Sequence, residues 1–154
     1  MKIEPAACSD LEALGRLYEE LYVRMAALQP EHFRPARQSP EFLQSILDSQ
    51  DGDILTARDP SGEAVGFAVV RFQHTPEYPC FRSRQYTCLM DLVVTENRRG
   101  QGVGRALLKA VEDWARSRGS AFVELGVLSE NHPAIGLYES YGFLERRKVM
   151  EMEL

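Results

Sequence analysis

Cysteine is scarce in this chain, and long apolar runs are missing. The three cysteines, Cys8, Cys80 and Cys88, form no CxxC pair, which argues against a disulfide framework and against a structural zinc site. We therefore expect reduced thiols in a cytoplasmic protein and no bound metal. No stretch approaches the roughly 18 apolar residues of a membrane span, and Glu4 places a charge where a signal peptide would be apolar.

Positive charge is also in short supply. The chain has 18 Lys and Arg against 23 Asp and Glu, a net charge of 18 − 23 = −5. This balance argues against a general nucleic-acid binder, whose surface is basic, and weakly favours a cationic partner. With 44% apolar and 27% charged residues, the composition excludes a disordered chain or a coiled-coil rod. We expect one folded domain over residues 1–154.

Apolar periodicity predicts elements in the order β-α-α-β-β-β-α-β-α-β. In chain order these are a strand at 2–5, a helix ending near Gln29, a short helix after Ser39-Pro40, strands at 54–58, 64–72 and 86–94, a helix at 102–118, a strand at 121–127, a helix from Ala134 to Tyr141 and a strand at 148–154. The helical crossover between 86–94 and 121–127 makes those two strands parallel, whereas the 54–72 hairpin is antiparallel. The fold class is therefore α+β, with a mixed sheet flanked by helices.

The segment richest in chemical information runs from Val94 to Arg105. A buried strand there enters a turn with glycines at 100, 102 and 104, and the turn opens a helix. The free N–H groups and positive dipole end of a helix start attract anions, and Arg99 and Arg105 add charge. The pattern predicts a diphosphate site. A Walker A loop requires a Gly-Lys pair, which is absent, and the dinucleotide fingerprint requires glycine where Arg105 stands. A helix start that is merely rich in glycine is the alternative.

Two motifs resemble those of one enzyme family. Residues 99–104 (RGQGVG) match [RQ]-x-x-G-x-[GA], the acyl-CoA pyrophosphate loop of the GNAT superfamily of N-acetyltransferases. Residues 131–143 (NHPAIGLYESYGF) resemble its second motif, N-x-x-A-x-x-x-Y-x-x-x-G-F. The chain departs from many relatives at Gly126, where they carry asparagine.

The resemblance implies a GNAT-type, mostly antiparallel sheet in which strand 86–94 carries a bulge and splays from its parallel neighbour. Acetyl-CoA would enter that gap as the cosubstrate. The residues implied to bind it are Leu92, Val93 and Val94 through their backbone, Arg99, Gly100, Gln101, Gly102, Val103, Gly104 and Arg105 around the phosphates, and Asn131, Ala134 and Tyr138 along the acyl arm.

Two residues are the catalytic candidates. The family motif gives Tyr138 the role of general acid toward the departing CoA thiolate, and a hydroxyl with an ordinary pKa near 10 keeps its proton at neutral pH. Periodicity alone also allows Tyr138 to be a core aromatic. Asp91 is our choice for the base that deprotonates the amine; Glu124, Glu77 and His74 are alternatives, and Asp91 could instead be a structural carboxylate.

The acceptor site is the least determined part. By family analogy the first two helices and the loop after the third strand shape it, so Tyr22, Phe33, Tyr78 and Glu124 are candidate acceptor contacts. Aromatic rings can bind a cationic amine, although they can equally belong to the core. We expect transfer to a small cationic amine or a peptide amine by direct attack. A non-catalytic acyl-CoA sensor or partner module is the alternative, and exposed sheet edges permit a homodimer.

Overall fold

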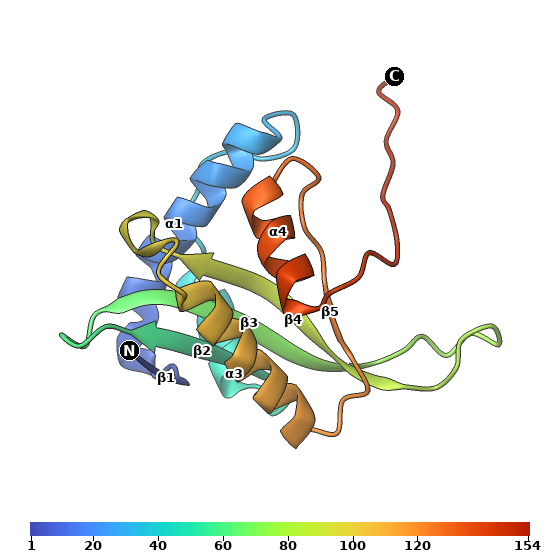
Figure 1. Ribbon diagram of the computed structural model, residues 1–154, viewed down its shortest axis with the longest axis horizontal. Helices are drawn as coiled ribbons and strands as arrows, with labels where there is room; N and C mark the ends of the chain where they lie inside the picture. The colour runs from blue at the N-terminus through green and yellow to red at the C-terminus, as the bar shows by residue number, and fades with distance from the viewer.

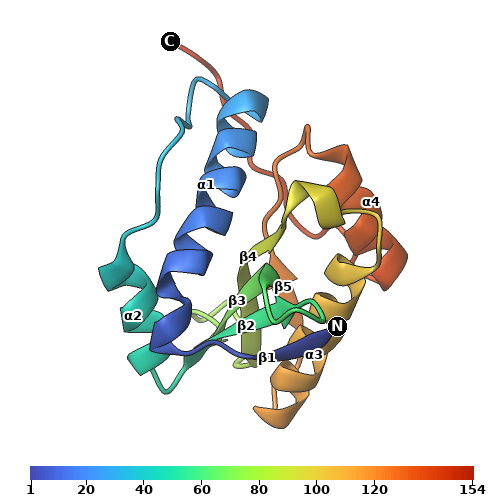
Figure 2. The same cartoon turned by 90° about the vertical axis from the view of Figure 1, so that its left-hand side faces the viewer.

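A computed structural model describes residues 1–154, and it contains one five-stranded sheet with helices on both faces (Figures 1 and 2). The elements in chain order are β1 (Lys2–Pro5), η1 (Cys8–Asp10), α1 (Leu11–Leu28), α2 (Pro40–Asp48), β2 (Gly52–Arg58), β3 (Ala64–His74), β4 (Gln85–Val94), η2 (Glu96–Arg98), α3 (Val103–Ser117), β5 (Val123–Leu125) and α4 (His132–Tyr141). None of these helices combines the length and apolarity that a membrane crossing requires.

The strands follow one another across the sheet in chain order, β1-β2-β3-β4-β5. The first three pairings are antiparallel, and β4 and β5 are parallel because α3 carries the chain back between them. Helices α1 and α2 cover one face, and α3 and α4 cover the other (Figure 2). The predicted mixed, mostly antiparallel sheet is confirmed.

Local sequence signals place the helix ends as expected. Helix α1 stops at Leu28, two residues before Pro30, because a residue that precedes proline avoids the helical region. Helix α2 starts where the Ser39 hydroxyl accepts the Phe42 N–H at 3.1 Å, which is an N-cap. Helix α4 ends at Gly142, whose positive φ of 120° suits glycine.

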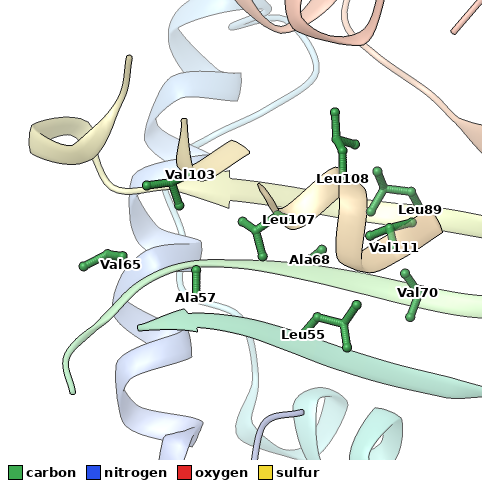
Figure 3. Packing of buried hydrophobic residues seen from close by; sticks show 10 residues of the cluster. All are labelled: Leu55, Ala57, Val65, Ala68, Val70, Leu89, Val103, Leu107, Leu108 and Val111. Atoms are coloured by element: carbon green, nitrogen blue, oxygen red, sulfur yellow. The ribbon is translucent and has the colours of Figure 1, made fainter. Parts of the chain in front are cut away.

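The core is divided by the sheet into two clusters. On one face, α1 and α2 bury Leu14, Tyr18 and Ile46 against Phe67 of β3. On the other face, α3 packs a stripe of apolar side chains onto β2, β3 and β4 (Figure 3). The residues of this second cluster are Leu55, Ala57, Val65, Ala68, Val70, Leu89, Val103, Leu107, Leu108 and Val111. Both helical layers are therefore fixed to the sheet that carries the site.

Strand β4 is irregular in the way the family resemblance implied. Val69 lies opposite Asp91 while Val70 lies opposite Leu89, so Met90 is an extra residue and forms a bulge. The parallel pairing with β5 covers only Thr87 to Leu89, although β4 continues to Val94. The edge of β4 that faces β5 is therefore open beyond the bulge.

The predicted strand at 148–154 is wrong. Residues 144–154 form no regular element and no backbone hydrogen bond within the chain. The alternation of Met150, Met152 and Leu154 is that of a strand, but no edge of the chain's own sheet lies against it. The predicted strand at 121–127 is also shorter, since only Val123–Leu125 pairs with β4.

Candidate active site

Six consecutive backbone N–H groups at the start of α3, from Gly100 to Arg105, have no acceptor in the protein. The first bond of the helix is formed by the N–H of Ala106, which reaches the carbonyl of Gly102 at 3.0 Å. Gly100 and Gly102 have φ values of 72° and 84°, a region where glycine is favoured. The free donors and the positive end of the α3 dipole form an anion site.

Side chains around this loop add charge and hold it in place. Arg99 donates from Nε to the carbonyl oxygen of Val94 at 2.9 Å, so its terminal nitrogens remain exposed. Gln101 donates to the carbonyl oxygen of Asn97 at 3.0 Å, which closes the turn. The guanidinium of Arg105 lies 5.3 Å from the centroid of the Tyr141 ring. The loop is thus fixed by its own side chains and keeps two positive groups at its surface.

Gly104 lies where α4 approaches the glycine loop closely. A Cβ atom at this position would lie 2.9 Å from Cδ2 of Leu137. The same Cβ would lie 3.9 Å from Cγ2 of Val94, so the strand end, the glycine loop and α4 meet at one point. Val103, buried in the core, anchors the loop from below. The two family motifs therefore meet at Gly104.

Asp91 is held on the α1 face of the sheet. The Tyr18 hydroxyl donates to its Oδ2 at 2.7 Å. Burial raises the pKa of the Asp91 carboxyl above its usual range, and the hydrogen bond from Tyr18 offsets part of that rise. A carboxylate with a raised pKa and one oxygen not bonded to the protein is suited to accept a proton.

Tyr138 projects from α4 into the same region. Its ring packs against Phe143, with the ring centroids 5.8 Å apart. Burial first, and the charge of Asp91 second, raise the pKa of its hydroxyl to about 12. The hydroxyl forms no hydrogen bond within the protein, so the ring packs on the core while the hydroxyl stays available to donate its proton.

Asn131 joins α4 to α1. Its Oδ1 atom accepts the N–H of Ala134 at 3.4 Å, the geometry of an N-cap, and it also accepts a hydrogen bond from Arg24 at 3.3 Å. Next to it, Gln29, which follows α1, donates to the carboxylate of Glu130 at 3.0 Å. These bonds connect the end of α1 to the start of α4 above the open edge of β4.

The structure brings some of the predicted acceptor residues near Asp91 and leaves one far away. Tyr22 lies close enough to Asp91 for the two groups to interact. Burial first, and the negative charge of Asp91 second, raise the pKa of the Tyr22 hydroxyl. Glu124 lies opposite Cys88 on β5 and forms an ion pair with Arg147. Phe33 follows α1 and packs edge-on against His32 at 6.3 Å.

Tyr78 belongs to the loop between β3 and β4, which projects away from the α1–α4 side of the molecule (Figure 1). Its side chain is 67% exposed and contacts Phe81, with ring centroids 6.3 Å apart. The structure therefore does not bring Tyr78 to Asp91 or Tyr138.

Three polar contacts of the site were not predicted from the sequence. Tyr18 holds Asp91, Gln38 donates to the Tyr22 hydroxyl at 2.7 Å, and Glu20 accepts the Thr95 hydroxyl at 2.8 Å just before the glycine loop. The available signal was Tyr18 on the apolar stripe of α1, because a buried polar group requires a partner. The sequence did not indicate which partner.

Comparison with known proteins identifies the family. A family model described as the acetyltransferase (GNAT) family matches residues 14–143. The chain belongs to the GNAT family of acetyltransferases. This GNAT protein is 34% identical over 110 residues to an aminoglycoside N(6')-acetyltransferase type 1 of Stenotrophomonas maltophilia, with 71% of each chain covered. It is 34% identical over 98 residues to streptothricin acetyltransferase of Streptomyces lavendulae, covering 62% of this chain and 48%, about half, of that relative.

Solved structures share the fold. A mutant of the BH1408 protein from Bacillus halodurans superposes with a TM-score of 0.95 at 26% identity, covering 100% of this chain and 99% of that one. The aminoglycoside N-acetyltransferase AAC(6')-Iy in complex with CoA superposes with a TM-score of 0.76 at 21% identity, covering 99% and 98%. The second likeness concerns the fold alone. The GNAT fold and the acyltransferase class predicted from the two motifs are thus confirmed.

Proposed function

We propose that this GNAT protein transfers the acetyl group of acetyl-CoA to a primary amine by direct attack in a ternary complex. The observation that carries the proposal is the run of six free N–H groups from Gly100 to Arg105, at the end of a strand whose edge is open. The diphosphate of CoA can accept hydrogen bonds from these N–H groups, and its extended pantetheine arm can pair with the open edge of β4. Asp91 and Tyr138 both belong to this region.

Each part of the cosubstrate has a matching part of the protein. The phosphate oxygens would accept from the free loop N–H groups, with Arg99 and Arg105 adding positive charge. The amides of the pantetheine arm would pair with the backbone of Leu92, Val93 and Val94, as an added strand does. An N–H group of that strand would polarise the thioester carbonyl. Asn131 and Ala134 would line the arm at the start of α4.

The proton transfers balance over two side chains. A cationic amine first releases one proton to solvent. The neutral amine nitrogen then forms a bond to the carbonyl carbon of the thioester, and Asp91 takes the second proton that this nitrogen loses. The carbon–sulfur bond breaks, and Tyr138 gives its hydroxyl proton to the thiolate. Asp91 and Tyr138 then exchange the proton through solvent, which restores both groups. Alignment of the amine and the thioester supplies the largest part of the rate acceleration.

The charge of Asp91 links the two proton transfers in time. The pKa of the Tyr138 hydroxyl is raised to about 12, partly by that negative charge. A thiol has an ordinary pKa of about 8.5, so transfer from Tyr138 is unfavourable while Asp91 is ionised. Once Asp91 has accepted the amine proton, it is neutral and its contribution to the raised pKa disappears. Protonation of Asp91 therefore removes the smaller of the two causes of the raised Tyr138 pKa, and burial, the larger cause, remains.

We infer that the acceptor is a small cationic amine. The relatives are named as acetyltransferases of aminoglycosides and of streptothricin. Asp91 adds negative charge beside the open edge of β4, and Glu124, opposite Cys88 on β5, adds a second charge that its ion pair with Arg147 offsets. Burial is the main cause of the raised pKa of the Cys88 thiol, and the charges of Glu124 and Asp91 add to it. Both carboxylates therefore lie near Cys88. A cationic amine would be attracted to this region.

An amine-panel assay tests the proposal. The purified protein is incubated with acetyl-CoA and with aminoglycosides, polyamines, amino acids and short peptides, and thiol release is followed. We expect release with at least one cationic amine and a higher Tm in the presence of CoA. A CoA-dependent rise in Tm with no thiol release across the whole panel would favour the acyl-CoA-binding module over the enzyme.

A further inference from the structure

Two acidic side chains from outside the glycine loop hold η2, the turn that leads into it. Glu20 of α1 accepts the Thr95 hydroxyl at 2.8 Å with Oε1 and the Glu96 N–H at 3.1 Å with Oε2. At the end of η2, Nη2 of Arg98 donates to Oδ2 of Asp59 at 2.7 Å. Asp59 lies in the turn between β2 and β3. Two separate parts of the fold therefore fix this short turn.

The contact on the β2–β3 turn is itself well fixed. Oδ1 of Asp59 accepts the Ser61 N–H at 2.9 Å, the Ser61 hydroxyl at 2.6 Å and the Glu63 N–H at 3.1 Å. The Asp59 side chain is only 9% exposed. Just before η2, the Thr95 N–H donates to the carbonyl oxygen of Val65 in β3 at 2.9 Å. A shift of η2 would therefore break bonds to the sheet, to this turn and to α1.

Helix α1 is joined to the end of β4 at two places. Tyr18 donates to Asp91 within the strand, and Glu20, two residues further along the helix, accepts from Thr95 directly after the strand. One helix therefore orients the candidate base and also holds the approach to the anion site.

The charge of Glu20 is the wrong sign for a direct role in binding CoA. Asp59 is paired with Arg98, but both hydrogen bonds of Glu20 come from uncharged groups. The Glu96 N–H that Glu20 accepts is four residues before Gly100, where the free N–H groups begin. A carboxylate near a bound diphosphate repels it. Any favourable effect of Glu20 on CoA must therefore act through the geometry of the turn.

We propose that Glu20 is a positioning residue for the diphosphate of CoA. Its two hydrogen bonds fix Thr95 and Glu96, and so they set the direction of the N–H groups from Gly100 to Arg105. Hydrogen bonds weaken steeply as donor and acceptor move out of line, so a small rotation of η2 would weaken several of these bonds together. The inference rests on the proposed function, because it assumes that CoA binds at this loop.

Glu20→Gln tests the proposal by the sign of its effect. Glutamine keeps the size of the side chain, but it has one oxygen and cannot accept from both Thr95 and Glu96. We expect calorimetry to show a Kd for CoA that is about 3–10-fold higher, the factor that corresponds to about one hydrogen bond. A purely electrostatic effect has the opposite sign, because removal of a negative charge would lower the Kd.

Glu19→Gln is the matched control. Glu19 is the neighbouring residue of α1, and its carboxylate forms an ion pair with Nε of Arg37 at 2.9 Å rather than a bond to η2. This variant loses the same charge and also loses an ion pair. Its Kd for CoA should equal that of the wild-type chain. Urea unfolding of both variants checks that they are folded.

Two further measurements separate positioning from a general structural role. Thr95→Val removes the hydroxyl that Glu20 holds, so it should also raise the Kd for CoA. The double variant with Glu20→Gln should show less than the product of the two single effects, because both changes break the same contact. Pantetheine, which lacks the diphosphate, should bind the Glu20→Gln variant and the wild-type chain equally in an NMR titration.

A Kd for CoA that is unchanged or lower in Glu20→Gln would overturn the proposal. An equal rise in Glu19→Gln, or an equal loss of pantetheine binding, would also overturn it, since the effect would then not be specific to the diphosphate. A wild-type chain that binds no CoA is a distinct result, and it would overturn the proposed function on which this inference rests.

Discussion

The hydroxyl of Tyr18 donates a hydrogen bond of 2.7 Å to Oδ2 of Asp91, and so ties helix α1 to the bulge of β4. Tyr18 is fully buried and packs on Phe67, with ring centroids 4.8 Å apart. One oxygen of the carboxylate is therefore fixed by a rigid donor, and the other has no partner in the protein. This bond sets both the orientation of Asp91 and part of its affinity for a proton.

Removal of that bond should move the pH dependence of the reaction. In Tyr18→Phe the ionised form of Asp91 loses a donor, so the pKa of the carboxyl rises further above its usual range. The base must be ionised to act, and the rate rises as pH passes through this pKa. We expect the acidic limb of the kcat profile to move to higher pH, with kcat at neutral pH reduced and the KM for acetyl-CoA unchanged.

Tyr22→Phe is the matched control for this change. Tyr22 is one turn further along α1, and its hydroxyl accepts from Gln38 rather than bonding to Asp91. The acidic limb of this variant should stay in place. If both variants shift the limb equally, the hydrogen bond from Tyr18 is not what sets the pKa of Asp91.

Asp91→Asn should remove the base and keep the shape of the site. The asparagine oxygen can still accept from Tyr18, so the fold and the Kd for CoA should be preserved. Loss of a positioned general base typically lowers the rate by about 10²–10⁴-fold, and we expect kcat to fall in that range. The acidic limb should vanish with it. An unchanged profile, measured by thiol release against pH, would assign the base elsewhere, with Glu124 as the next candidate.

The glycine loop and its helix were predictable because their signals are local. Glycines at 100 and 102 adopt positive φ, and the free N–H groups follow from the start of a helix at Val103. The cap at Ser39 and the stop at Gly142 are local in the same sense. Each of these features depends on a few neighbouring residues, which one sequence contains.

The position of Asp91 was not predictable in this way. Strict alternation would place it on the same face as Leu89, toward α3. The bulge at Met90 reverses the alternation, so Leu89 packs against α3 while Val93 packs against α1. Asp91 consequently meets Tyr18, a residue 73 positions away. A bulge of one residue changes which helix a side chain faces. The amino-acid sequence of the strand alone does not predict the bulge.

The final strand failed for a different reason. The alternation of residues 148–154 is that of a strand, but a strand also requires a neighbouring edge, and these residues form no regular element. That neighbour is not part of the chain's own sheet, whose order ends at β5. Alternation of apolar residues is a property of one segment, whereas a strand forms only when a second segment supplies hydrogen-bond partners.

Tyr138→Phe should slow turnover more than it weakens binding. The substitution removes the hydroxyl and keeps the ring that packs on Phe143, so the fold should be preserved. We expect kcat to fall by at least about tenfold, because the thiolate leaves without a donor, while the Kd for CoA changes little. With a pKa of about 12, the Tyr138 hydroxyl should add no alkaline limb below about pH 10.

Tyr141→Phe is the control on the same helix. The Tyr141 hydroxyl donates to Glu112 of α3 at 2.7 Å and has no part in the proposed proton transfer. Its loss should lower stability slightly and leave kcat unchanged. Equal losses of kcat in the two variants would remove Tyr138 from the mechanism.

Gly102→Ala, compared with Gly62→Ala, should show whether the backbone of the glycine loop binds CoA or only contributes to stability. Gly102 has a φ of 84° and Gly62, in the turn between β2 and β3, has a φ of 89°, and a Cβ at either position meets nothing within 4 Å. Alanine at either site should therefore lower the free energy of unfolding by roughly 1–2 kcal/mol through backbone strain alone. Only Gly102→Ala should also disturb the free N–H groups, so only this variant should raise the Kd for CoA in calorimetry. Equal Kd values for the two variants would mean that the loop does not hold the diphosphate.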